Sequence, residues 1–151
     1  MDSVLKFSIP GTPQTKLRPR FSRHKGKVHT YNSQRDEDQT MRWKFKARMN
    51  GSPLEGPIAI DMKFYMSIPK SKSKKIKEKM RLGEIKHTIK PDCDNLVKKP
   101  TDCMNGIVYL DDKQIYKLTA EKLYGENPRT EITVWQESSQ VSDSENGELL
   151  K

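Results

Sequence analysis

The chain has 151 residues, of which only 32% are hydrophobic, and its formal net charge at pH 7 is +9. This length corresponds to one domain, and no stretch reaches the roughly 18 apolar residues that a membrane span requires. So basic a chain attracts a polyanion, most commonly nucleic acid, although charge that serves solubility alone is the alternative.

The first residues predict a strand. Leu5, Phe7 and Ile9 alternate with polar residues up to a Pro-Gly pair, which is the pattern of a half-buried strand. The segment lacks the apolar core of a secretory signal. Cys93 and Cys103 have neither CxxC nor zinc-finger spacing. We therefore expect a cytoplasmic protein with reduced thiols and no zinc site.

Residues 12–30 show no periodicity and contain no acid, which predicts a basic loop or hairpin with its turn at Lys25-Gly26-Lys27. Alternating bases in an extended segment would face DNA together and contact phosphates, which position a protein without specifying sequence. The candidate DNA-binding residues of this segment are Lys16, Arg18, Arg20 and Arg23.

A helix is expected next. Ser33 is its predicted N-cap, and the three acids that follow lie favourably near the positive end of the helix dipole. Met41, Phe45 and Met49 recur at helical spacing and form a narrow apolar stripe. Asn50-Gly51 ends the pattern.

The apolar alternation over 57–66 is the clearest in the chain and predicts a strand. The lysine-rich segment 70–82 is typical of a solvated helix that lies lightly on the surface. Its Lys74 and Lys75 are further candidate DNA contacts.

The remaining pattern completes an α+β fold, with a small mixed β-sheet and two or three helices packed on it. The expected segments are strands at 85–89, 107–110, 115–120 and 131–135, with a short helix after Pro91. Residues 1–136 are the expected domain. Residues 137–151 hold four acids and one base and predict a disordered tail. So few apolar residues indicate either a small core or one completed by a second copy.

The candidate chemistry begins at Asp92 and Asp94, which are two residues apart in a stretch that Pro91 biases towards extended backbone. At that spacing both carboxylates leave the same face, where they repel each other unless a cation lies between them. Oxygen ligands of this kind suit Mg²⁺ or Mn²⁺. A helix begins here, and Asp94 is its predicted cap.

Lys98 projects one turn from Asp94, where it would stabilise charge on a reacting phosphate or protonate the departing oxygen. An ion pair with Asp94 is the equal alternative. Asp111 and Asp112 follow a strand-like run, so they point to opposite faces and only one joins a metal site; the residues alone favour an exposed turn. Pro100 requires the helix to kink or to start later.

The spacing of these residues resembles the signature of the RusA family of crossover-junction endodeoxyribonucleases. The matching motif is Lys90-Pro91-Asp92-x-Asp94-Asn95-Leu96-x-Lys98, then Asp102, Asn105-Gly106 and Asp111-Asp112-x-Gln114-Ile115. Further matches are Phe7-x-Ile9-Pro10-Gly11-x-Pro13, Lys16-x-Arg18-Pro19-Arg20 and Pro69-x-Ser71. The resemblance covers residues from about 5 to 124, and several fixed spacings agree in order, which makes it specific.

The resemblance implies a RusA-like homodimer that resolves Holliday junctions by paired symmetric nicks in DNA recombination and repair, often in phages or prophages. By position, Asp92, Asp94 and Asp112 correspond to the catalytic carboxylates that hold Mg²⁺, with Mn²⁺ as a substitute. Lys98 corresponds to the catalytic lysine, and Asp111 is a neighbour with no assigned role. Lys99-Pro100-Thr101 departs from the alanine- and leucine-rich turn of the family.

Two other functions are open. One is a non-catalytic nucleic-acid-binding factor that retains the fold, and the other is a metal nuclease that acts on flaps or other branched DNA. A pure binder has no reason to hold three acids that repel one another and the phosphates of DNA. The carboxylates therefore favour an enzyme.

Overall fold

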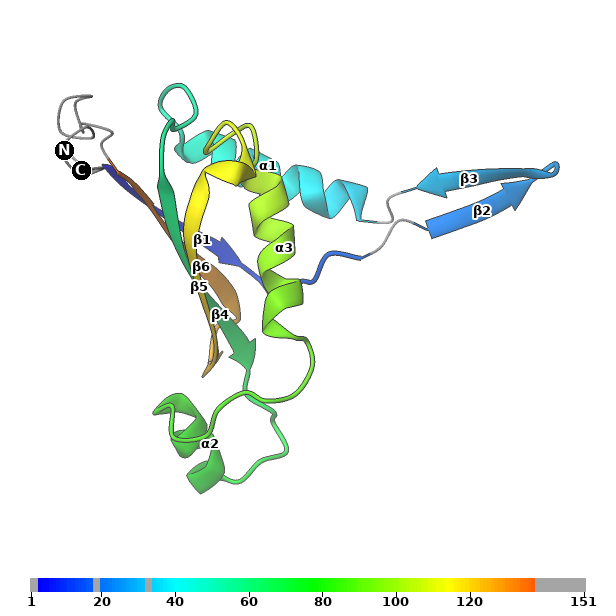
Figure 1. Ribbon diagram of the computed structural model, residues 1–151. Coiled ribbons are helices and arrows are strands. Elements are labelled where there is room, and N and C mark those ends of the chain that lie inside the picture. Colours follow the sequence, from blue (N-terminus) through cyan, green and yellow to red (C-terminus); the bar gives the residue numbers. More distant parts are fainter. Residues whose placement is uncertain (1–2, 18–19, 32–33, 138–151) are drawn as a thin grey trace, which may run out of the picture.

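The computed structural model describes residues 3–17, 20–31 and 34–137. Its centre is a four-stranded sheet in the order β1-β6-β4-β5 (Figure 1). Strand β6 runs antiparallel to both of its neighbours, whereas β4 and β5 run parallel. The strands are β1 (Ser3–Pro10), β4 (Ile58–Ser67), β5 (Ile115–Gly125) and β6 (Arg129–Gln136). The expected α+β class with a small mixed sheet is confirmed.

One face of this sheet carries the hydrophobic core. Every second residue of β4, beginning with Ile58, is buried on that face. Two helices cover it, α1 (Arg35–Arg48) through Phe45 and α3 (Cys93–Met104) through Leu96. The alternation expected over 57–66 is thus confirmed, because a strand with one covered face buries alternate side chains.

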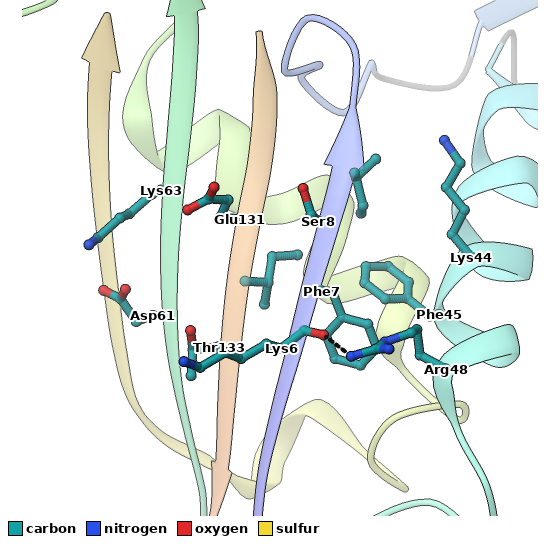
Figure 2. A pocket seen from close by; sticks show the side chains of 12 residues that line it. Lys6, Phe7, Ser8, Lys44, Phe45, Arg48, Asp61, Lys63, Glu131 and Thr133 are labelled. Carbon is teal, nitrogen blue, oxygen red and sulfur yellow. Dashed lines mark hydrogen bonds between the residues drawn. The ribbon is translucent and has the colours of Figure 1, made fainter. Parts of the chain in front are cut away.

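The outer face of the sheet is polar. Figure 2 shows Asp61 and Lys63 of β4 beside Glu131 and Thr133 of β6 on this face. These side chains belong to the residues that alternate with the buried ones. In Figure 1, no helix of the described ranges packs on this face of the sheet. It is therefore open to solvent, whereas α1 and α3 cover the other face.

Helix α1 forms as its apolar stripe predicts. Phe45 is completely buried and packs edge-on against Phe7 of β1, with the ring centroids 5.1 Å apart. Met41 and Met49 are half-buried against the same core. The acids Asp36, Glu37 and Asp38 occupy the first turn, where the helix dipole favours them.

The N-cap of α1 is Gln34, one residue later than the predicted Ser33, which lies outside the described residues. The Gln34 side chain makes no capping bond. Its Oε1 accepts from the Leu17 N–H and its Nε2 donates to the Thr15 carbonyl, both at 2.9 Å. This buried amide therefore ties the helix start to the segment after β1.

The basic segment forms the expected hairpin, which projects away from the sheet (Figure 1). Its strands are β2 (Arg20–His24) and β3 (Lys27–Tyr31). Lys25 and Gly26 connect them with φ values of 52° and 78°. Two consecutive residues with positive φ are the signature of a tight hairpin turn, so the turn predicted at this position is confirmed.

The lysine-rich segment forms a short surface helix, α2 (Lys74–Arg81). Ser73 caps it, because its Oγ accepts from the Ile76 N–H at 3.3 Å. Met80 is buried and Ile76 is half-buried, while most lysines stay in solvent. This is the lightly attached helix that the pattern indicates.

The alternation in 85–89 predicts a strand, but the structure has none there. Side chains attach it to β5 in place of a backbone ladder. His87 is buried and packs on the Tyr124 ring at a centroid distance of 5.0 Å. The Ile89 carbonyl accepts a hydrogen bond from Lys122 Nζ at 2.8 Å. In a strand, the donor to this carbonyl would be a backbone N–H of the neighbouring strand.

The strand expected at 107–110 does not form either, and this segment forms turns with two isolated bridges at Tyr109, to Leu54 and to Asn105. Val108 and Tyr109 are both completely buried. Consecutive residues of a strand point to opposite faces, so a strand on the core surface buries only one of such a pair. The Met104 carbonyl accepts from both Ile107 and Val108 and keeps the chain curled after α3.

The strands expected at 115–120 and 131–135 both form, and they differ from the prediction only in where they begin or end. Strand β5 continues past its expected end at Ala120, and β6 begins two residues before 131. The Glu137 N–H donates to the Pro57 carbonyl at 3.1 Å, so this residue still belongs to the fold. The predicted tail beyond it lies outside the described residues. Both cysteines are free. Among the described helices, none is long and apolar enough to cross a membrane.

Candidate active site

The start of α3 carries the first two candidate carboxylates. Asp92 is the N-cap, with φ −70° and ψ 144°, and Asp94 lies in the first turn. The predicted cap at Asp94 and the extended pair of carboxylates are therefore wrong, because the helix already begins at Cys93. The Asp92 side chain makes no capping bond. Both carboxylates are exposed and close to the positive end of the helix dipole.

Lys122 on β5 holds the segment that enters this helix. Its Nζ donates to the carbonyls of Ile89 and Pro91 at 2.8 and 2.9 Å, directly before Asp92. Burial lowers the pKa of the neighbouring His87, and the positive charge of Lys122 acts in the same direction. The sequence pattern does not reveal Lys122, since a lysine in a solvent-exposed strand gives the same signal.

Lys98 follows Asp94 by one helical turn and is exposed. Its Nζ donates to Asn95 Oδ1 at 3.3 Å, and its ammonium contacts this amide rather than Asp94. The Lys98 side chain is thus exposed on the same side of α3 as Asp94, one helical turn away.

Pro100 does not delay the helix. Helix α3 runs from Cys93 to Met104 with Pro100 buried inside it. The Leu96 N–H already donates to the Asp92 carbonyl at 3.1 Å, so the first turn is formed before the proline. Only the bond that Pro100 would give to the Leu96 carbonyl is lost. Lys98 therefore has a regular helical position.

Lys99 is a buried charge that the sequence analysis missed. The side chain is 1% exposed, and its Nζ contacts Gln14 Oε1 at 2.9 Å, Glu37 Oε2 at 3.2 Å and Asp38 Oδ1 at 3.3 Å. It ties α3 to the first turn of α1 and to the segment after β1. A signal exists in the sequence, because position 99 is one turn from Leu96 on the apolar stripe of α3.

The variant Lys99→Met should lower the free energy of unfolding by about 1–3 kcal/mol, since it keeps the stem but removes the charged hydrogen bonds. Glu37 and Asp38 are partly exposed, so water hydrates the carboxylates that lose their partner. Chemical denaturation measures the change. The neighbouring exposed lysine provides the control, and Lys98→Met should stay within about 0.5 kcal/mol of wild type. Equal stability of the two variants would contradict this role of Lys99.

The second pair of acids lies at the 3₁₀ turn η1 (Asp112–Gln114). Asp111 caps it, because its Oδ1 accepts from the Lys113 N–H at 3.0 Å and its own N–H donates to Gln114 Oε1 at 2.8 Å. Asp111 thus has a local structural role, whereas Asp112 presents an exposed carboxylate.

The two carboxylates influence each other. The hydrogen bond from the Lys113 backbone lowers the pKa of Asp111. A side-chain hydrogen bond with Asp111 raises the pKa of Asp112, and the negative charges of Asp111 and Asp102 act in the same direction. A bound cation would relieve this repulsion, so the chemistry of the donor atoms suits a hard divalent metal ion.

The candidate carboxylates fall into two groups at opposite ends of α3. Asp92 and Asp94 lie at its start, whereas Asp112 lies beside its end, close enough to Asp102 for their charges to interact. Figure 1 shows η1 at the opposite end of α3 from α2. Twelve helical residues span about 18 Å. Over the ranges that the structure describes, no group of three acidic, histidine or cysteine side chains is placed to hold a metal ion.

The candidate DNA-binding residues are spread over three places. Lys16 forms an ion pair with Asp102. Arg18 lies outside the described residues, Arg20 belongs to β2, and Arg23 is exposed on the hairpin. Lys74 and Lys75 are exposed in the first turn of α2. The hairpin and α2 project from different sides of the molecule, and α2 lies near the start of α3 (Figure 1).

Comparison with known proteins gives concordant matches. Residues 10–135 match the family model described as Endodeoxyribonuclease RusA. The chain is 38% identical over 142 residues to the YqaN protein of Bacillus subtilis strain 168, a match that covers 89% of this chain and 96% of that protein. It is 31% identical over 141 residues to the crossover junction endodeoxyribonuclease rusA of Lactococcus phage r1t, with 89% and 98% covered.

Proposed function

Because the chain belongs to the RusA family of endodeoxyribonucleases, we propose that it is a Mg²⁺-dependent enzyme that resolves Holliday junctions by paired symmetric nicks. The observation that carries the proposal is the start of α3. Asp92, Asp94 and Lys98 are all exposed there, and neither the helix cap nor an ion pair between Asp94 and Lys98 accounts for them. Exposed acids on so basic a chain would repel its DNA substrate unless a cation is bound between them.

The chain's own residues would divide the work as follows. Asp92 and Asp94 would hold the metal ion, and Lys98, one turn after Asp94, would stabilise negative charge on the phosphate or give a proton to the departing oxygen. When bound, Mg²⁺ supplies positive charge at the phosphate and makes a water molecule a better nucleophile, and Mn²⁺ would substitute for it. Arg23, Lys74 and Lys75 would contact phosphates on either side.

We propose further that the enzyme is a homodimer and that each site takes residues from both copies. One copy holds Asp92 and Asp94 at one end of α3 and Asp112 at the other. A two-fold axis across the middle of α3 would place the partner helix in the opposite direction. Asp94 of one copy would then lie beside Asp112 of the partner subunit, and each dimer would contain two equivalent sites.

A surface suited to this contact lies along β5. Tyr116 and Leu118 are 55% and 42% exposed. In register Leu118 lies beside Ile60, on the face of the sheet that α1 and α3 cover elsewhere. The helices thus leave an apolar edge of the core open next to α3, and a second copy of the chain would close it.

Mixing two inactive variants tests the shared site. Asp94→Asn and Asp112→Asn should each be inactive as pure dimers. After the subunits are mixed and exchanged, half of the sites in a heterodimer combine Asp94 of one subunit with Asp112 of the other, so nicking should reappear. A gel assay on a labelled junction measures it. If the mixture stays as inactive as its components, each site lies within one subunit.

The substrate is tested by incubation with a labelled four-way junction, a flap, a duplex and a single strand, each with Mg²⁺ and with EDTA. We expect cleavage of the junction alone, and only with Mg²⁺. Equal cleavage of the flap would identify a nuclease of broader specificity. Tight binding of the junction without cleavage in Mg²⁺ would identify a DNA-binding factor that retains the fold.

The remaining expectations follow from this substrate. An enzyme that acts on DNA during recombination or repair would work in the cytoplasm. Residues 1–136 would be the endonuclease domain and 137–151 an appended acidic tail. The bond between Glu137 and Pro57 supports a domain end one residue later.

A further inference from the structure

An exposed tryptophan lines a groove that contains none of the proposed catalytic residues. Trp43 of α1 is 68% exposed, the highest exposure among the large hydrophobic residues described. It lines a groove of about 660 Å³ between α1 and the loops at 49–53 and 106–107. A large aromatic ring left in water beside a hollow is typical of a binding surface.

The groove carries positive charge only. Its lining includes Arg42 and Lys46 and contains no acid. The Lys46 ammonium lies 5.4 Å from the centre of the Trp43 ring, so a cation sits beside the aromatic face. The remaining lining residues are apolar or uncharged: Gln39, Met49, Gly51, Pro53, Gly106 and Ile107.

The hollow at the edge of β1 provides a contrast. It has a similar volume, about 650 Å³, but it contains Asp61 and Glu131 together with basic side chains (Figure 2). Its charge is therefore mixed. The groove at Trp43 differs in combining a flat aromatic surface with uncompensated positive charge, which is complementary to a ligand that is both aromatic and anionic.

The groove also adjoins the end of α3 that carries the second group of acids. Arg42 Nη2 approaches the Asp102 carbonyl at 3.5 Å, and Gly106 and Ile107 directly follow the helix. The charge of Asp102 in turn reaches Asp112. A DNA strand that passes the candidate carboxylates at this end would reach the groove within a short distance.

We infer that the groove at Trp43 binds an unpaired nucleotide of branched DNA, with the base stacked on the indole and the phosphate held by Arg42 and Lys46. This inference deepens the proposed function, since it assumes that branched DNA is the substrate. Stacking on aromatic side chains accepts any base, and nearby cations follow the backbone. The groove would thus hold a strand that has left the duplex at the branch point without reading its sequence.

Fluorescence tests the inference without any cleavage. The chain has two tryptophans, so Trp135→Phe leaves Trp43 as the only reporter. In EDTA, a single-stranded oligo(dT) of about ten nucleotides should quench Trp43 in a saturable manner. A blunt duplex and an abasic oligonucleotide of equal length carry phosphates without accessible bases and should not quench it. Equal quenching by all three, or quenching by none, would overturn the inference.

The affinity for a fluorescently labelled oligo(dT), measured by fluorescence anisotropy, separates the contribution of base stacking from that of the positive charges. Trp43→Ala should weaken binding by about 5- to 150-fold, and Trp43→Phe should restore most of the loss. Lys46→Gln should lower the salt slope by about 0.7, the value for one phosphate contact on a single strand. Lys44→Gln is the matched control, because Lys44 belongs to the same helix but lines the other hollow. Equal effects of the two lysines would contradict the assignment.

Sedimentation of the Trp43→Ala variant tests whether the groove instead binds a second copy of the chain. If this variant loses a dimer that the wild type forms, the surface is an interface between copies and the inference is wrong. A failure of the junction assay with intact quenching by oligo(dT) would instead remove the proposed resolvase activity and leave the nucleotide-binding groove.

Discussion

The Asp94→Asn variant should cleave a four-way junction more than about 10²-fold more slowly than wild type. Asparagine keeps the shape of the side chain but removes the negative charge of Asp94, the proposed metal ligand, from the first turn of α3. Binding of the junction should persist or become tighter, because one charge that repels phosphate is removed. Single-turnover cleavage in Mg²⁺ and binding in EDTA measure the two effects separately.

Asp36→Asn is the matched control for this variant. Asp36 is also an exposed aspartate in the first turn of a helix, but it lies on α1. The control therefore reproduces the loss of one charge and of one dipole interaction without touching the candidate site. A near wild-type rate for Asp94→Asn, or an equal loss for Asp36→Asn, would contradict the metal assignment.

Lys98→Ala should slow cleavage by about 10²–10⁴-fold and change junction affinity little. The ammonium is expected to act where the phosphate gains charge in the transition state, and such interactions affect the rate rather than the binding of substrate. Folding stability should be unaffected within about 0.5 kcal/mol, since the side chain is exposed.

Lys117→Ala provides the control for Lys98→Ala. Lys117 is an exposed lysine of β5 that pairs in register with Ala59, on the outer face of the sheet. Its removal should leave the cleavage rate unchanged. A Lys98→Ala variant that binds weakly but cleaves normally at saturating enzyme would show that this lysine contacts DNA and takes no part in the reaction.

The parts of the fold that follow from the sequence are those set by a single local pattern, either one buried face or one tight turn. The alternation in 57–66, the stripe of Met41, Phe45 and Met49, and the Lys25-Gly26 turn each depend on one local rule, and each is confirmed. The strand predictions for 85–89 and 107–110 are wrong because alternation or an apolar run also arises in a turn held by tertiary contacts. His87 and Tyr109 are buried by partners that are distant in sequence.

In the candidate site, too, some features follow from the local sequence and others depend on the three-dimensional fold. The motif identifies Asp92, Asp94 and Lys98 by residue type and spacing, and all three are exposed within the first two turns of α3. The local pattern does not reveal that Asp111 caps a 3₁₀ turn, or that Lys99 is buried among acids of α1, because both depend on how separate segments meet. The separation of Asp112 from Asp92 by the length of α3 is likewise a property of the three-dimensional fold alone.

The central claim is that this protein resolves junctions, and the positions of its nicks test that claim most directly. A four-way junction labelled on each strand in turn is incubated with the wild-type protein in Mg²⁺, and the products are mapped at nucleotide resolution. We predict two nicks on opposing strands at symmetric positions across the branch point, and none in EDTA. Single nicks that lie on unrelated strands, or cleavage that persists in EDTA, would contradict the account.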